Sequence, residues 1–180
     1  MRSVQWAAGV AVIVLTGCSG TRTGAAEGVV SPTPPRATAK LLAPLAPRVS
    51  GALNSDVTQA SIGTTICSPG WTKTVRPSGS FTTPIKRRLL SSQELPGYLA
   101  DYELDHLVSL ALGGAPRDLA NLWMQPYEHK GARFAPDGRG SESKDTVEST
   151  LNRDVCAGRL TLAEAQRRIA ADWRTALAGL

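Results

Sequence analysis

The stretch that decides the predicted fold is YELDHLVSLALGGAPRDLANLWMQ, residues 102–125. A Gly-Gly pair at 113–114 separates two apolar runs within it, and paired glycines in such a place are typical of a hairpin turn. The pattern predicts one strand over residues 103–111 and a second, shorter strand that ends around residues 121–124. It also sets several polar side chains beside the apolar ones, and these are candidates for a site.

Two helical patterns follow the hairpin. Residues 141–158, SESKDTVESTLNRDVCAG, carry apolar residues at helical spacing, begin with serines that can cap a helix, and end at Gly158. Residues 161–177, TLAEAQRRIAADWRTAL, open with Thr-x-x-Glu, a capping box, and place Trp173 on the apolar face. We therefore expect two long helices, with Trp173 in the core.

The segment before the hairpin is less regular. Residues 56–77 carry β-branched residues broken by Pro-Gly and Arg-Pro, and they are interpreted as extended segments and loops. A short helix is expected after Pro84. The sequence thus predicts an α+β domain over residues 51–180, in which a hairpin is followed by helices.

Asp105, His106 and Asn121 are residues of the types that a phosphodiester-hydrolysing site needs. A histidine with a pKa near neutrality can take the proton of an attacking water. Carboxylate and amide oxygens bind hard divalent cations, which stabilise charge on phosphoryl oxygens. The hairpin brings the three together only if its first strand ends, twists or bulges at 105–106, because adjacent strand residues face opposite sides.

The segment ELDHLVSLALGG followed by NLW resembles the HNH, or ββα-metal (His-Me finger), nuclease family, and its flanks resemble secreted bacterial proteins with such a domain. The resemblance implies a hairpin-plus-helix core with additional helices. It implies that Asp105 and Asn121 hold one divalent metal ion, with Mg²⁺ favoured over Mn²⁺ and Zn²⁺. It also implies that His106 is the general base.

Members of that family often present a third ligand, frequently a histidine, on the helix after the Asn, and the helix predicted here has none. The substitutes are His129, Asp145 and Glu148, of which the last two share a helix face. His129 could equally be a solvated loop residue, and the two acids could be charges favoured by the helix dipole. Glu103, on the same strand face as Asp105, either orients a ligand or water or is simply solvated.

Residues 71–90 carry five basic side chains and no acidic one. Such a run can hold phosphates without reading base sequence, and Trp71 and Phe81 could stack on bases. Equally, it could be a solvated helix face beside core aromatics. The candidate phosphate contacts are Lys73, Arg76, Lys86, Arg87 and Arg88.

Overall charge adds little to this argument. The chain has a formal net charge of +5, but residues 51–180 hold 15 Lys and Arg against 14 Asp and Glu. The excess of positive charge therefore lies upstream of the predicted domain, and the charge of the domain does not by itself indicate an anionic partner.

The first 50 residues are interpreted as a targeting signal followed by a linker. Residues 1–17 have the pattern of a signal peptide, with Arg2 before the apolar run WAAGVAVIVL. LTGC, which ends at Cys18, resembles a bacterial lipobox and implies lipid attachment there, on the outer face of the cell membrane. Plain secretion is the alternative. Residues 18–50, rich in Pro, Ala and Thr, are expected to form a disordered linker.

Two cysteines remain in the predicted domain, Cys67 and Cys156. Because an exported chain meets an oxidising compartment, they are expected to form one disulfide. The alternative is two unrelated buried thiols.

Two functions follow from these patterns. The first is a lipid-anchored, metal-dependent HNH-like endonuclease of low sequence specificity, with DNA favoured over RNA as substrate. The second is a non-catalytic HNH-like binding lipoprotein of the cell envelope. The complete Asp-His-Asn set favours the nuclease, and the missing helix histidine favours the binding protein. No pattern in the sequence indicates an oligomeric state.

Overall fold

The computed structural model describes residues 50–180. The predicted signal peptide, the predicted lipid attachment at Cys18 and the linker up to residue 49 lie outside the described residues, and these expectations stay predictions. Within the described part, no helix is both long and apolar enough to cross a bilayer. The elements in chain order are η1 Ile62–Thr64, α1 Trp71–Val75, α2 Gly79–Ser92, η2 Leu99–Asp101, β1 Tyr102–His106, η3 Leu110–Leu112, η4 Leu119–Asn121, β2 Leu122–Pro126, α3 Glu128–Gly131, η5 Ala132–Phe134, α4 Ser141–Cys156 and α5 Leu162–Asp172.

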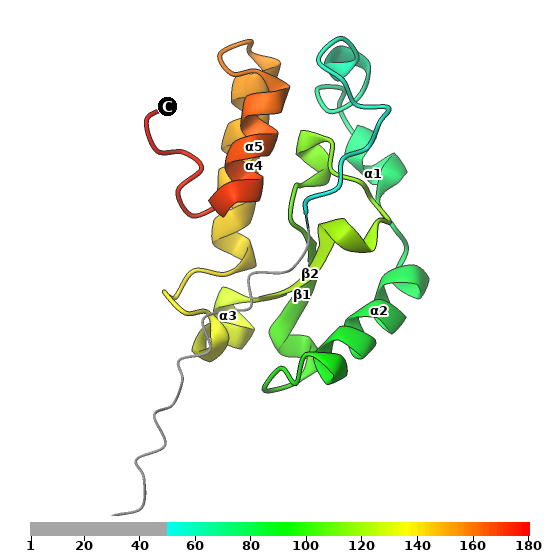
Figure 1. Cartoon of the computed structure of the whole chain (residues 1–180), viewed down its shortest axis with the longest axis vertical. Coiled ribbons are helices and arrows are strands. Elements are labelled where there is room, and N and C mark those ends of the chain that lie inside the picture. Colours follow the sequence, from blue (N-terminus) through cyan, green and yellow to red (C-terminus); the bar gives the residue numbers. More distant parts are fainter. Residues whose placement is uncertain (1–49) are drawn as a thin grey trace, which may run out of the picture. The chain divides into compact units, whose positions relative to one another are not determined.

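The predicted α+β class is confirmed. Strands β1 and β2 form an antiparallel pair in register from Tyr102 opposite Pro126 to His106 opposite Leu122. Figure 1 shows this pair between α2 on one side and the neighbouring helices α4 and α5 on the other. The chain therefore has a hairpin covered by helices, with β1 ending in the middle of the molecule.

The predicted strand boundaries and the tight Gly-Gly turn were wrong. β1 ends at His106, and the connection to β2 is a long loop that contains η3 and η4. The two glycines serve this loop: Gly113 ends η3 with a φ of 76°, and a Cβ on Gly114 would lie 1.8 Å from the Val108 carbonyl oxygen. Gly-Gly thus marks a close backbone approach rather than a two-residue turn.

Helix α4 occupies the region that the sequence predicts. Val147, Leu151 and Val155 are all buried on its inner face, as the helical spacing indicates. Neither Ser141 nor Ser143 caps it through its side chain; instead, Glu128 Oε1 accepts hydrogen bonds from the backbone N–H of Gly140 at 2.7 Å and of Ser143 at 2.9 Å. A carboxylate at this end also complements the helix dipole.

Helix α5 packs against α4 and completes the core. Its N-cap is Thr161, whose side chain accepts a hydrogen bond from the backbone N–H of Glu164 at 3.2 Å. The other half of the predicted capping box is absent, because the Glu164 carboxylate accepts from Arg167 and Arg168 instead. Trp173 is buried and its place in the core is confirmed. The same core includes Val108 and Leu112 from the loop after β1, so the two helices hold that loop against the hairpin.

Two predictions for the N-terminal part were incomplete. The helix expected after Pro84 begins earlier, so that Pro84 lies inside α2 at a position in its first two turns. The segment read as extended and loop contains the short helix α1 and the turn η1. Helix α2 contacts the two strands and α1 contacts η3, and tertiary contacts of this kind can override weak local propensity.

The predicted disulfide is confirmed. Cys67, before α1, is bonded to Cys156 at the C-terminal end of α4, across a sequence separation of 89. Asn152, one turn earlier in α4, donates hydrogen bonds to the backbone oxygens of Ile66 and Ala111. The N-terminal segment is thus attached to the same end of α4 by a covalent bond and by a hydrogen-bonded amide.

Reduction of the disulfide is expected to lower the free energy of unfolding by about 4–5 kcal/mol, because the bond closes a long loop in the unfolded chain. Chemical denaturation of the full chain with and without reductant measures this difference. The double variant Cys67→Ala/Cys156→Ala should be insensitive to reductant. An unchanged denaturation midpoint for the parent chain in reductant would contradict the expectation.

Candidate active site

His106 is the last residue of β1, and its imidazole is held by a backbone group. The ring is 7% exposed, and Nε2 lies 3.0 Å from the carbonyl oxygen of Pro116. Because a carbonyl oxygen only accepts, Nε2 must carry the proton and donate. In the neutral ring the proton is then absent from Nδ1, which has no hydrogen-bond partner among residues 50–180. Burial lowers the pKa of His106, outweighing the opposing effects of Pro116 and Asp105.

Lys144 is the residue that connects helix α4 to the strand beneath it. Its side chain is 1% exposed, yet its ammonium lies 2.8 Å from Asp105 Oδ2 and donates to the His106 carbonyl oxygen at 2.8 Å. It is also paired with Glu148, one turn along the helix. Three oxygens therefore surround one buried ammonium group.

Sequence reasoning missed Lys144, although a signal was present. Lys144, Val147, Leu151 and Val155 recur at the spacing of one helix face, and the last three are apolar. A lysine at the start of a buried stripe, four residues before Glu148, predicts a buried ion pair on that face. The ion pair was not predicted, because lysine side chains are usually exposed to solvent.

Four carboxylates gather near the ammonium, and we call Glu103, Asp105, Asp145 and Glu148 the acidic cluster. Burial raises the pKa of Glu103 to about 7, with repulsion from Asp105 and Asp145 adding to the effect. Burial, followed by repulsion from Asp105, also raises the pKa of Asp145. One ammonium thus faces more negative charge than it can neutralise.

The same surroundings favour the charged form of Lys144 and the neutral form of Glu148. Burial disfavours the charge on Lys144, but the carboxylates of Asp105 and Glu148 outweigh it and hold its pKa above the usual value. Burial raises the pKa of Glu148. Attraction to the Lys144 ammonium acts to lower it, and repulsion from Asp105 acts to raise it further. The ammonium is therefore the fixed charge of the site, whereas the pKa values of Glu103, Asp145 and Glu148 are raised.

No bulge interrupts strand alternation at Asp105 and His106. Both are paired in register, with Trp123 and Leu122 opposite them. Adjacent residues on a regular strand face opposite sides, so the Asp105 carboxylate joins Lys144 while the His106 ring turns toward Pro116. The strand ends at His106, so the irregularity expected at residues 105–106 is a strand end.

Asn121 does not take the metal-ligand position expected for it. It is fully buried, and its Oδ1 accepts from the Val108 backbone N–H at 2.9 Å. Its Nδ2 donates to the carbonyl oxygens of Val108 and Ala115 at 3.0 and 3.1 Å. With both amide atoms bonded to backbone, Asn121 holds the loop between the strands together. This role follows from contacts distant in sequence, which a motif alone does not reveal.

His129 lies apart from His106 and Asp105. It is on the short helix α3 with its side chain 81% exposed, and Nδ1 is 3.0 Å from Glu142 Oε1. This position agrees with the alternative of a solvated residue. Glu142 also accepts a hydrogen bond from the backbone N–H of Glu128, so the contact belongs to the junction between α3 and α4.

The residues present do not fit a divalent ion between Asp105 and Glu148, because the Lys144 ammonium fills the space that they share. In residues 50–180 no group of three or more His, Cys, Asp or Glu side chains is arranged to hold a metal ion. The donor chemistry of the acidic cluster is suited to a hard cation, but here the cation is an amino group of the chain itself.

The structure divides the predicted basic run into two parts. Arg76 and Lys86 are electrostatic neighbours of the site: Arg76 acts on His106 and Asp145, and Lys86 acts on Glu103. Lys73 is exposed on α1, and Arg87 and Arg88 are exposed on α2. The solvated-face alternative therefore describes the last three better than a shared phosphate site does.

Comparison of the chain with family models, curated proteins and solved structures finds no match. The resemblance to the HNH family thus rests on the residues quoted above, and it stays a prediction.

Lys144→Ala is expected to lower the free energy of unfolding by about 3–5 kcal/mol, because it leaves buried carboxylates without their countercharge. Chemical denaturation at neutral pH measures the loss. Arg167→Ala is the matched control, since Arg167 forms an exposed ion pair with Glu164 on α5 and should change stability little. Equal effects of the two substitutions would contradict the assigned role of Lys144.

The raised pKa of Glu103 predicts a defined pH dependence. Its folded-state pKa of about 7 exceeds the ordinary 4.5, so the fold favours the protonated acid. The contribution of Glu103 to stability is therefore present below pH 4.5 and is lost as the pH rises through about 7. Glu103→Gln should raise the melting temperature above pH 7 and leave it unchanged below pH 4.5. Thermal melts that shift equally at both ends would count against this assignment.

Proposed function

We propose that the chain hydrolyses phosphodiester bonds of nucleic acid, with His106 as the general base. The observation that carries the proposal is the hydrogen bond from His106 Nε2 to the Pro116 carbonyl oxygen, which leaves the lone pair of Nδ1 available. A backbone acceptor on one ring nitrogen orients a histidine and fixes its tautomer for proton transfer at the other. The lowered pKa keeps the ring neutral at pH 7.

In the proposed reaction a water molecule attacks phosphorus. His106 Nδ1 takes one proton of that water as its oxygen forms the new bond to phosphorus, and the bond from phosphorus to the leaving oxygen breaks. The imidazolium then returns its proton to solvent, and the leaving oxygen takes a proton from solvent. Lys144 fixes the position of His106 from the other side of the strand, because it binds the carbonyl oxygen of that residue.

The substrate contacts in this proposal are Arg76 and Lys86, the two members of the basic run that act on the site. Arg76 is exposed, so a phosphate can approach its guanidinium beside His106. Contacts of this kind bind the phosphate backbone and carry no base information, which supports low sequence specificity. DNA remains the favoured substrate over RNA in the proposal.

The divalent metal stays a prediction and enters no step above. When bound, such an ion would supply Lewis-acid stabilisation of charge on the phosphoryl oxygens. Because Lys144 fills the space between Asp105 and Glu148, binding there would require the ammonium group to move. Export and lipid anchoring at Cys18 also remain part of the proposal. The disulfide supports export, since such bonds persist in oxidising compartments, and lipid anchoring rests on the sequence pattern at Cys18.

A binding lipoprotein without catalysis is the second candidate, and the Lys144 ammonium favours it. The ammonium group already provides a positive charge between Asp105 and Glu148, so these carboxylates have a countercharge without a metal ion. In this case the chain would bind an envelope polymer or a protein and would leave phosphodiester bonds intact. The two candidates differ in one observable, the cleavage of nucleic acid.

His106→Ala is expected to reduce nicking of supercoiled plasmid by at least about 100-fold, because proton transfer by a positioned base contributes that much. The full chain is incubated with plasmid in EDTA and, separately, in Mg²⁺, Mn²⁺ and Zn²⁺. His129→Ala is the matched control, since it removes the other histidine, which lies on the exposed side of α3.

Equal nicking by the parent chain and by His106→Ala would contradict the proposed base. Plasmid binding without nicking under all conditions would favour the binding lipoprotein. Nicking that persists in EDTA would contradict the metal requirement and leave the role of His106 standing.

A further inference from the structure

A cavity of about 390 Å³ lies along β2, between the C-terminal end of α2 and the loop that leads to α4. It shares no lining residue with the acidic cluster or with His106. Small-molecule sites in proteins have volumes of about 300–1,000 Å³, so this cavity can hold a compact ligand. The proposed reaction does not use it.

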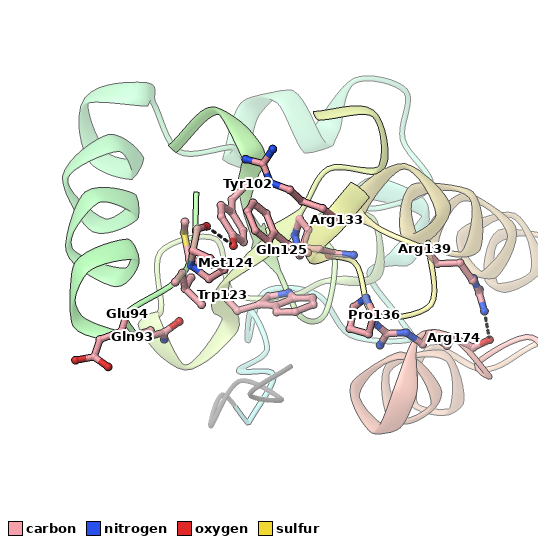
Figure 2. Close-up of a pocket in the computed structure, with 14 residues that line it drawn as sticks. Gln93, Glu94, Tyr102, Trp123, Met124, Gln125, Arg133, Pro136, Arg139 and Arg174 are labelled. Atoms are coloured by element: carbon pink, nitrogen blue, oxygen red, sulfur yellow. Dashed lines mark hydrogen bonds between the residues drawn. The ribbon is translucent and has the colours of Figure 1, made fainter. Parts of the chain in front are cut away.

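The walls of the cavity are largely apolar and include aromatic rings. Tyr102 and Phe134 stack with their centroids 5.6 Å apart and their planes at 8°. Trp123 and Met124 of β2 line the same space (Figure 2). Flat aromatic and apolar surfaces favour a flat ring as occupant, because ring faces pack well against one another.

Gln125 provides the observation that points to a ligand. It lines the cavity and is 1% exposed, yet neither atom of its amide has a hydrogen-bond partner among residues 50–180. The indole N–H of Trp123 is also unpartnered in the described part of the chain. In Figure 2 the Gln125 side chain extends from β2 into the space between Trp123, Arg133 and Pro136. A buried amide without partners is costly, and a ligand that supplies them removes that cost.

Two of the three arginines that line the cavity are at one side of it. Arg139 and Arg174 lie together, on the side away from Gln93 and Glu94 (Figure 2). Arg174 is paired with Asp137 at 3.0 Å, whereas Arg139 has no carboxylate partner among the described residues. The Arg139 guanidinium carbon lies 5.0 Å from the centroid of the Trp173 ring, and Nη1 donates to the Arg174 carbonyl oxygen at 3.3 Å, so two contacts hold the group in place. An anionic group on the ligand would find its partner here.

We propose that this cavity binds one nucleotide. The base lies between the apolar and aromatic walls with its hydrogen-bonding edge against the Gln125 amide, and the phosphate lies toward Arg139. An amide offers a donor beside an acceptor, which is the pattern that glutamine uses to bind adenine. The choice of a nucleotide among ring-bearing anions rests on the proposed function, but binding is measured independently of cleavage.

Calorimetric titration of the full chain with each nucleoside monophosphate tests the inference. Adenosine, which lacks the phosphate, and phenyl phosphate, which lacks the base edge, are titrated in parallel. A short single-stranded oligonucleotide separates a free nucleotide from one within a chain. We expect the monophosphate to bind at least about tenfold more tightly than either truncated compound, because each lacks one set of contacts.

Two substitutions sharpen the test. Gln125→Leu should weaken nucleotide binding at least about tenfold while leaving the melting temperature unchanged or higher, since it removes an unpartnered buried amide. Arg139→Ala should weaken binding of the monophosphate and not of adenosine. Arg167→Ala, on the exposed face of α5, should change neither.

Failure of every monophosphate to bind, or binding by Gln125→Leu equal to that of the parent, would overturn the inference. Equal affinity for phenyl phosphate and the nucleotides would overturn the assignment to a nucleotide. If nucleotides bind and plasmid is not nicked, the cavity stands and the proposed hydrolysis falls. If plasmid is nicked and no nucleotide binds, the reverse holds.

Discussion

The arrangement of this domain depends on one buried ammonium group. Lys144 extends from α4 to the end of β1, where it meets the carboxylate of Asp105 and the backbone oxygen of His106. An unpaired charge in this position would be costly, so the helix and the strand must be joined in one register for the pair to form. The loop after β1 packs into the core beneath the same helix. The position of the candidate base thus follows from the position of α4.

A second constraint acts at the other side of the hairpin. The Asn121 amide bonds the backbone of Val108 and Ala115, which closes the loop that carries Pro116 to His106. Lys144 fixes the backbone of the histidine, and this loop fixes its ring. The position of the His106 ring thus depends on Lys144 and on this loop more than on the local sequence motif. A small displacement of either one would change the geometry of proton transfer.

The sequence predicted the features that local pattern determines. The stripe of Val147, Leu151 and Val155 marked α4, the Thr161 cap marked α5, and export with two leftover cysteines indicated the disulfide. The strand ends were not predictable. The Asn121 side chain bonds the backbone N–H and carbonyl oxygen of Val108, which is distant along the chain, so these groups do not continue the strand pairing. Lys144 was missed for a different reason. Its burial depends on Asp105, which lies on another element and has no fixed spacing from it in sequence.

The proposed proton transfer depends most on the protonation state of His106, and nitrogen NMR of the imidazole rings measures that state directly. The chain has only two histidines, so in the His129→Ala variant the remaining imidazole signals belong to His106. We expect a neutral His106 with its proton on Nε2 and a pKa lowered from the ordinary 6.5. A proton on Nδ1, or a pKa above 6.5, would contradict the proposed base.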